Sequence, residues 1–155
     1  MMDDHELRIS KIENGTVIDH VTGGQALNVL AILGIDGTSG EQVSVGMNVP
    51  SERLRRKDVV KVEGRELSQH ELDVLSLIAP EATINIVRDY DVVEKSRVDP
   101  PDRVVGVLSC PNPDCITNAG EPVDTRFNVL DGGNVRCEYC DEIVREDLSE
   151  HVGVP

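Results

Sequence analysis

The chain has 155 residues, and its 29 aspartates and glutamates outnumber its 15 lysines and arginines to give a formal net charge of −14. This charge argues against a surface for nucleic acid or anionic membrane, because affinity for polyanions comes largely from clustered Lys and Arg. Hydrophobic residues make up 39% of the chain and aromatic residues only 2%, so we expect an aliphatic core in one domain or two small ones.

The first predicted elements are a strand and a helix. Apolar residues begin at Leu7 and continue through Thr16–Val21, which indicates the first strand. Thr22 is a candidate cap for a helix over Gln25–Leu33, and Gly34 is a candidate for its end.

Four more strands and a second helix follow. Apolar residues alternate through Val43–Val49, which predicts a strand with one apolar face, and Val59–Glu63 is the next strand. Ser68 and Glu71 have the spacing of a capping box and open a helix that stops at Ala79-Pro80. The last two strands are expected at Thr83–Val87 and Tyr90–Val93. The order β-α-β-β-α-β with one extra strand predicts an α+β fold, in which a ferredoxin-like antiparallel sheet carries both helices on one face.

A proline-containing segment, Ser96–Arg103, separates this region from the remainder of the chain. Adjacent prolines prevent regular pairing and favour an extended linker. We therefore expect an N-terminal domain over residues 1–97, a linker over 98–103 and a C-terminal domain over 104–155. Short strands of a small all-β, zinc-ribbon-like domain are expected at Arg103–Leu108, Thr125–Leu130 and Glu142–Leu148.

All four cysteines lie in the C-terminal part, in two close pairs. Cys110 and Cys115 enclose Pro-Asn-Pro-Asp, and Cys137 and Cys140 enclose Glu-Tyr. Two such loops can bring four thiolates to the corners of a tetrahedron, which is the geometry that Zn²⁺ accepts with sulfur ligands. Four thiolates leave no open position for water or substrate, so we predict one structural Zn²⁺ per chain.

Two disulfides or four buried thiols are the alternatives to a metal. The acidic N-terminus has no apolar h-region, and no apolar run approaches the length of a membrane span, so we expect a cytoplasmic protein with no signal peptide. Thiols stay reduced in that compartment. A domain of about fifty residues rarely buries enough apolar surface to fold alone, and a metal would supply the missing stability.

Lysine is scarce in this acidic chain and occurs only at Lys11, Lys57, Lys61 and Lys95. An acidic, lysine-poor surface suits a high-salt cytosol, where salt screens self-repulsion, so we expect a halophilic source; an acidic protein from a non-halophile is the alternative. Strand alternation places Lys57 and Lys61 on one face, and Lys95 ends the last strand. This grouping suggests a site for a compact anion such as a nucleotide phosphate. A solvated strand face with scattered charge is the competing interpretation.

Several segments together resemble the aspartate carbamoyltransferase regulatory chain, in order and from about Leu7 to Ile143. The matching segments are Gly15–His20, Gly46–Ser51, Arg56–Lys61, Ala79–Asn85, Val93–Arg97 and Cys110–Cys115. One departure is Glu94, which stands where a small residue is common in the family. Strand alternation is expected to point Glu94 away from Lys95.

The resemblance implies a chain that is not an enzyme. It would bind nucleoside triphosphates in its N-terminal domain and hold the catalytic chain, a trimer, through its zinc domain. CTP and UTP would inhibit, and ATP would activate, the first committed step of pyrimidine synthesis. Position by position, the implied nucleotide-binding residues are Ile12, Asp19, His20, Lys57, Lys61, Asn85, Val87, Tyr90, Val92 and Lys95. Of these, His20, Lys57 and Lys95 would meet the triphosphate, and Asp19 and Lys61 would hold ribose or base.

The resemblance also implies homodimers formed through the N-terminal domain. The regular alternation of Gln42–Val49 favours the same assembly, because an exposed edge strand invites pairing with a second copy.

Two rival classes of function remain. A zinc-ribbon module for nucleic acid would need aromatic platforms and a basic face. A small enzyme built on Asp19 and His20 would need a third orienting group, and adjacent strand residues are expected to point to opposite faces.

Overall fold

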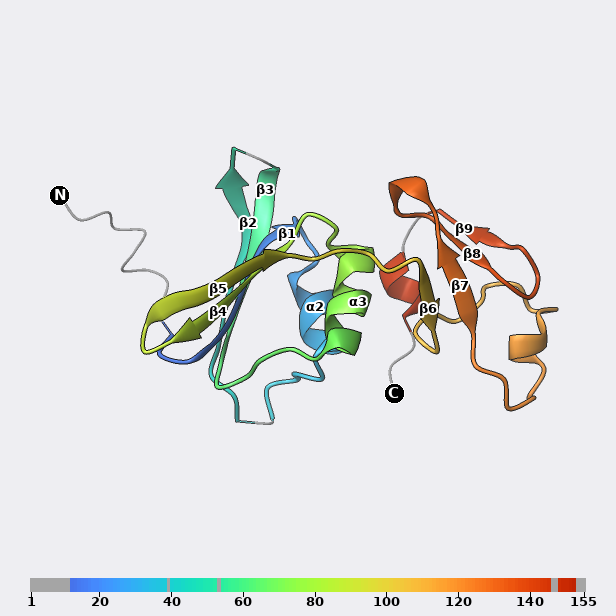
Figure 1. The fold of residues 1–155 in the computed structure, drawn as a ribbon, viewed down its shortest axis with the longest axis horizontal. Helices are drawn as coiled ribbons and strands as arrows, with labels where there is room; N and C mark the ends of the chain where they lie inside the picture. Colours follow the sequence, from blue (N-terminus) through green and yellow to red (C-terminus); the bar gives the residue numbers. More distant parts are fainter. Residues whose placement is uncertain (1–11, 39, 53, 146–147, 153–155) are drawn as a thin grey trace.

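The computed structural model describes residues 12–38, 40–52, 54–145 and 148–152 (Figure 1). The strand residues expected around Leu7 lie outside these ranges. Five strands form the first sheet, in the order β2-β3-β1-β4-β5, and every neighbouring pair is antiparallel. The strands are β1 (Gly15–Thr22), β2 (Val43–Ser51), β3 (Arg55–Glu63), β4 (Thr83–Arg88) and β5 (Asp91–Arg97).

Helices α2 (Ala26–Ile32) and α3 (Gln69–Ile78) both lie on one face of this sheet (Figure 1). Strand residues Ile18, Val60 and Ile84 are buried there in one aliphatic cluster with Leu75 of α3. The predicted ferredoxin-like α+β fold, with an extra strand at the edge, is therefore confirmed. We call the other side of the sheet, turned away from α2 and α3, the distal face.

Local sequence signals explain where α2 ends and where α3 begins. At the end of α2, the N–H of Gly34 donates to the carbonyl of Ala31 (3.0 Å) and the N–H of Ile35 to that of Leu30 (2.9 Å). Gly34 has φ +72°, the left-handed conformation that this Schellman arrangement requires. At the start of α3, the Ser68 side chain accepts from the Glu71 N–H and the Glu71 side chain accepts from the Ser68 N–H, so the predicted capping box is confirmed.

The start of α2 differs from the prediction. Its N-cap is Gln25, whose side chain makes no capping hydrogen bond, and Thr22 contributes its backbone carbonyl to the Gln25 N–H (3.0 Å). The carboxylate of Asp58, on β3, accepts instead from the N–H of Gly24 and of Ala26. A residue distant in sequence therefore caps this helix.

Two bulges interrupt strand pairing on either side of β3. The register of β1 against β3 shifts between Ile18 and Val21, and that of β2 against β3 shifts between Gly46 and Val49. Each bulge contains one non-glycine residue with positive φ, His20 and Asn48, both at +56°. The expected alternation along β2 therefore breaks at Asn48. Bulges of this kind re-aim side chains near functional sites.

The second sheet has four short strands in the order β6-β7-β8-β9. They are β6 (Arg103–Val105), β7 (Arg126–Val129), β8 (Val135–Cys137) and β9 (Ile143–Val144), with the 3-10 turns η1 (Ile116–Asn118), η2 (Asp131–Gly133) and η3 (Leu148–His151) around them. Three of these strands lie within the predicted segments, whereas β8 was not predicted. Phe127 of β7 and Val135 of β8 are fully buried and belong to one hydrophobic cluster.

The two sheets share a packed boundary. Val74 and Leu77 of α3 belong to the same buried cluster as Phe127, and Leu148 of η3 packs against the clusters of both sheets. Figure 1 shows α3 and η3 lying between the two sheets. Among the described residues, no helix is both long and apolar enough to cross a bilayer.

Candidate functional site

The first cysteine loop is held by local hydrogen bonds. The Cys115 N–H donates to the carbonyl of Asn112 (3.1 Å), and the side-chain amide of Asn118 donates to the carbonyls of Cys110 (2.9 Å) and Asn112 (2.7 Å). These bonds close the loop although four residues separate the cysteines. The Thr117 hydroxyl donates to the sulfur of Cys115 at 3.2 Å.

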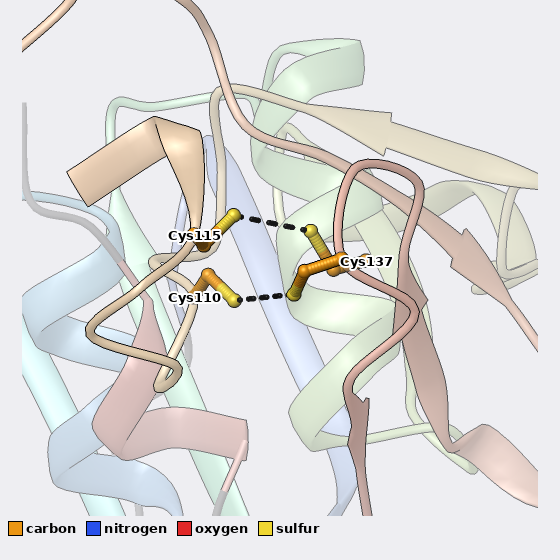
Figure 2. A group of neighbouring side chains, drawn as sticks. Cys110, Cys115 and Cys137 are labelled. Atoms are coloured by element: carbon orange, nitrogen blue, oxygen red, sulfur yellow. Dashed lines mark hydrogen bonds between the residues drawn. The ribbon is translucent and has the colours of Figure 1, made fainter. Parts of the chain in front are cut away.

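The second cysteine loop follows strand β8. Cys137 ends that strand and is fully buried, and its carbonyl accepts from the Asp141 N–H (3.0 Å). Asp141 has φ +65°, so the chain turns sharply after Cys140. The loop thereby faces the first one, and the cysteine side chains converge between the two loops (Figure 2).

The four sulfur atoms form one compact group in which all lie within 4.8 Å of one another. The Cys110 and Cys140 sulfurs are 3.5 Å apart, and those of Cys115 and Cys137 are 3.8 Å apart. A disulfide would need about 2.05 Å, so neither pair is bonded in this structure. A tetrahedron with metal–sulfur bonds of about 2.3 Å separates its sulfurs by about 3.8 Å. The observed spacing therefore fits four thiolates around one ion.

The environment of these thiols affects their protonation in opposite directions. Burial raises the pKa of the Cys110 thiol and of the Cys137 thiol, whereas the hydrogen bond from Thr117 lowers the pKa of the Cys115 thiol to about 7. Metal ligation requires thiolates, and a bound cation would offset the cost of burying their charge. The residues that would hold such an ion are Cys110, Cys115, Cys137 and Cys140.

The distal face of the first sheet carries a row of aligned residues. Strand pairing places Lys61 opposite Val17, Val17 opposite Asn85, and Asn85 opposite Lys95. Directly paired residues on neighbouring strands point to the same face. The amide of Asn85 donates to the carbonyl of Val17 at 3.4 Å. The row therefore brings two lysines and an amide from three strands onto one surface.

A second group on the distal face surrounds Asp19. The Lys57 ammonium lies 2.9 Å from one Asp19 oxygen, and the His20 N–H donates to that same oxygen at 2.6 Å. Burial disfavours ionisation of Asp19, but the Lys57 hydrogen bond and the His20 N–H together hold its pKa below the usual 3.8. Asp19 is therefore ionised at neutral pH, and it compensates part of the charge on Lys57.

The expected orientation of His20 was wrong. Its ring nitrogen Nδ1 lies 3.9 Å from an Asp19 oxygen and 3.1 Å from the Thr83 hydroxyl. The bulge in β1 breaks the alternation on which the prediction rested, so Asp19 and His20 lie together. Glu94 follows the prediction, because it pairs with Ile86 of the helix-side core whereas Lys95 pairs with Asn85.

The remaining sequence-predicted residues lie near the turn where β4 ends and β5 begins, or in the segment before β1 that bonds this turn. Ile12 and Val87 are buried, and Val92 pairs with Val87 across the two strands. Tyr90 is 61% exposed and has φ +69° in the two-residue turn that joins β4 to β5. Its N–H donates to the carbonyl of Glu13 at 2.9 Å, which fastens this turn to the segment before β1.

Sequence reasoning missed two polar residues beside this site. Thr83 is 4% exposed and contacts the His20 ring, and Asp58 is fully buried on the helix side of β3. Asp58 alternates with Val60 and Val62, so a charge on an apolar face was the available signal. Thr83 carries no comparable signal, because its contact depends on strand pairing.

Comparison with known families matches nearly the whole chain. Residues 7–99 match the family described as "Aspartate carbamoyltransferase regulatory chain, allosteric domain". Residues 102–150 match "Aspartate carbamoyltransferase regulatory chain, metal binding domain". The first range includes the described distal face, and the second includes the four cysteines.

Similar curated proteins carry the same description. The chain is 71% identical over 153 residues to the aspartate carbamoyltransferase regulatory chain of Natronomonas pharaonis, covering 99% of each chain. It is 72% identical over 149 residues to that of Haloarcula marismortui, with 96% of each chain covered. The protein from Methanocella arvoryzae is 55% identical over 150 residues, covering 95% of this chain and 96% of the relative. The chain therefore belongs to the aspartate carbamoyltransferase regulatory chain family and is a regulatory, non-catalytic subunit.

Proposed function

We propose that this chain binds nucleoside triphosphates on the distal face of its N-terminal sheet and so adjusts the activity of an aspartate carbamoyltransferase catalytic chain. The observation that carries the proposal is the placement of Lys57, Lys61 and Lys95 on one face of the sheet, in a chain of net charge −14. Lysines placed on one face suit a compact anion, because triphosphate oxygens accept charge-assisted hydrogen bonds.

The proposed roles of the residues are those that the family resemblance implies, and the chemistry of the side chains suits them. His20, Lys57 and Lys95 bind the triphosphate, and Asp19 with Lys61 binds the ribose or base. The base lies toward Asn85 and the turn at Tyr90, with Ile12, Val87 and Val92 as its apolar surroundings. Backbone and amide groups there can distinguish the donor and acceptor pattern of cytosine, uracil and adenine. CTP and UTP act as inhibitors in this proposal, and ATP acts as an activator.

We propose that the effect of nucleotide binding reaches the catalytic chain through the boundary between the two sheets. Val74 and Leu77 of α3 pack into the cluster of the metal-binding part, while Leu75 and Ile78 of the same helix pack into the cluster of the first sheet. A shift of that sheet would therefore move the second one. We divide the chain into an effector domain (1–97), a linker (98–103) and a zinc domain (104–155) that holds catalytic trimers.

We propose that the metal is Zn²⁺, one per chain. Its preference for tetrahedral thiolate sites and its lack of redox chemistry suit a closed structural centre. Elemental analysis of the purified chain should give one zinc per chain, and a different dominant metal would contradict the assignment.

Assembly is proposed to include a homodimer through β2. This strand is an edge of the sheet, and its Val45 and Met47 are 39% and 42% exposed. Beside it lies an apolar groove lined by Leu27, Leu30 and Val43, which a second copy would cover. Sedimentation at micromolar concentration and high salt should show dimers.

The proposed setting of the protein is the cytoplasm of a halophile, because an acidic composition suits concentrated salt.

The direct test is equilibrium binding of CTP, UTP and ATP to the full chain, with a single-stranded oligonucleotide as comparison. We expect triphosphate binding and no oligonucleotide binding. Titration of the holoenzyme with CTP and ATP then gives the sign of each effect. Failure of all three nucleotides to bind would refute the proposal.

A further inference from the structure

The carboxylate of Asp58 is completely buried and accepts three backbone hydrogen bonds. One oxygen accepts from the N–H of Gly24 (2.9 Å) and of Ala26 (2.8 Å), and the other accepts from the N–H of Asn48 (2.8 Å). Burial of a carboxylate is costly unless hydrogen bonds replace its hydration. These three donors belong to the connection from β1 to α2, to the first residue of α2 and to the bulge of β2, so Asp58 ties all three to β3.

Asp58 and its neighbour Lys57 act on opposite faces of the same strand. On the distal face, Lys57 bonds Asp19 within the bulge of β1. On the helix face, Asp58 bonds the residues that follow β1 directly. The segment from Asp19 in β1 to Ala26 at the start of α2 is therefore held from both sides by two consecutive residues of β3.

The bulge of β2 also lies close to the connection that follows β1. A Cβ atom added to Gly23, in the β1–α2 connection, would lie 3.2 Å from the side-chain oxygen of Asn48 and 3.4 Å from the Cβ of Arg56. The side chain of Arg56 donates in turn to the carbonyl of Asn48 at 3.1 Å. Displacement of the β1–α2 connection would therefore disturb the β2 bulge, and the Asp58 carboxylate is bonded to both.

We infer that Asp58 is a positioning residue for the effector site. It holds the β1–α2 connection and the β2 bulge against β3, and thereby keeps Asp19, His20 and Lys57 in place. The inference rests on the proposed binding of triphosphates to the distal face. Asp58 itself lies on the other side of the sheet and touches no ligand in this account. It also links the segment that follows β1 to the edge strand β2, because one of its oxygens bonds Gly24 and Ala26 and the other bonds Asn48.

Asp58→Asn is the informative substitution. The shape is kept, but one oxygen becomes an NH₂ group that faces backbone N–H donors, so one of the two regions loses its partner. The substitution also removes a negative charge, which on electrostatic grounds alone would strengthen binding of an anion. Weaker binding by this variant would therefore report lost positioning rather than a changed charge.

Ser68→Ala is the matched control. It removes the N-cap of the other helix, α3, and leaves the β1 and β2 bulges untouched. CTP affinity of the full chain should be measured for wild type and both variants, at a temperature where circular dichroism shows all three folded. We expect Asp58→Asn to bind CTP about five- to tenfold more weakly, within the usual range of coupling between sites, and Ser68→Ala to bind as the wild type does.

Each outcome decides a separate point. Absence of CTP binding by the wild type would refute the proposed function and the inference with it. Wild-type binding together with Asp58→Asn affinity within twofold of it would refute the inference alone. An equal loss in both variants would assign the effect to general destabilisation and likewise overturn the positioning role.

Amide hydrogen exchange of the wild-type chain supplies a test that needs no variant, should Asp58→Asn fail to fold. Addition of CTP should slow exchange at Gly24, Ala26 and Asn48 together, by severalfold, because their N–H groups share one acceptor residue. Exchange at Glu71, whose N–H bonds Ser68, should stay unchanged. Unaltered exchange at the Asn48 amide in the presence of bound CTP would contradict the inference.

Discussion

Replacement of Lys95 by alanine should weaken CTP and ATP to a similar extent, because both nucleotides present the same triphosphate. Lys95 lies on the edge strand β5, opposite Asn85 and in the row that includes Lys61. It differs from Lys57, which already has Asp19 at 2.9 Å to compensate its charge. Lys95 should therefore contribute a larger share of the attraction for phosphate.

The expected loss follows from the exposure of Lys95. A hydrogen bond to a charged group contributes about 1.5–3 kcal/mol, and about 1.4 kcal/mol corresponds to tenfold in affinity. Every residue of β5, including Lys95, is exposed, and exposed charges are screened by water and salt. The lower end of the range therefore applies, and we expect about a tenfold loss for each nucleotide.

The assay is equilibrium binding of CTP and ATP to the full chain, with Arg103→Ala as the control. Arg103 belongs to the second sheet, where its guanidinium lies 3.6 Å from Glu138, so this variant loses the same charge at a remote place. Arg103→Ala should bind both nucleotides as the wild type does. If Lys95→Ala kept CTP affinity within twofold of wild type, the phosphate site would have been placed wrongly.

Three further predictions follow from the same structure. Asn85→Ala should change CTP and ATP affinity unequally, since the two bases differ in donors and acceptors, and equal losses in the binding assay would contradict a base-reading role. Cys140→Ser should release the metal and abolish assembly with catalytic trimers, measured by elemental analysis and sedimentation; assembly of the zinc-free chain would refute this. The folded-state pKa of Asp19 lies below 3.8, so its ionised form contributes stability above that pH, and the contribution is lost as pH falls through the lowered pKa. Lys57→Met should raise this pKa in an NMR titration, whereas an unchanged pKa would show that Lys57 is not its main support.

Features coded by neighbouring residues were predictable from the sequence. The capping box at Ser68 and the glycine that ends α2 depend on residues within one turn of the helix, and both occur as expected. The cysteine group was predictable for a similar reason, because short loops restrict where each pair of thiols can lie. Alternation likewise placed Lys57 and Lys61 on one face of β3.

Features that depend on strand pairing were not predictable in the same way. The cap of α2 comes from Asp58, which is adjacent to Ala26 only after β3 has paired with β1. The bulge at His20 is set by that pairing too, and it reversed the expected orientation of the ring. Strand β8 was missed because it is three residues long and ends on a cysteine, so neither its length nor its composition marks a strand.

The acidity of the chain and its proposed anionic ligands are compatible in concentrated salt. At low ionic strength a net charge of −14 would repel a triphosphate over tens of ångströms, since the Debye length is about 30 Å at 0.01 M. At 1 M it is about 3 Å, so charges elsewhere on the surface no longer act at the site. Contacts as short as the 2.9 Å between Lys57 and Asp19 still operate over that distance. In such a medium an effector site can depend on a few lysines in direct contact with phosphate, while the rest of the surface remains acidic.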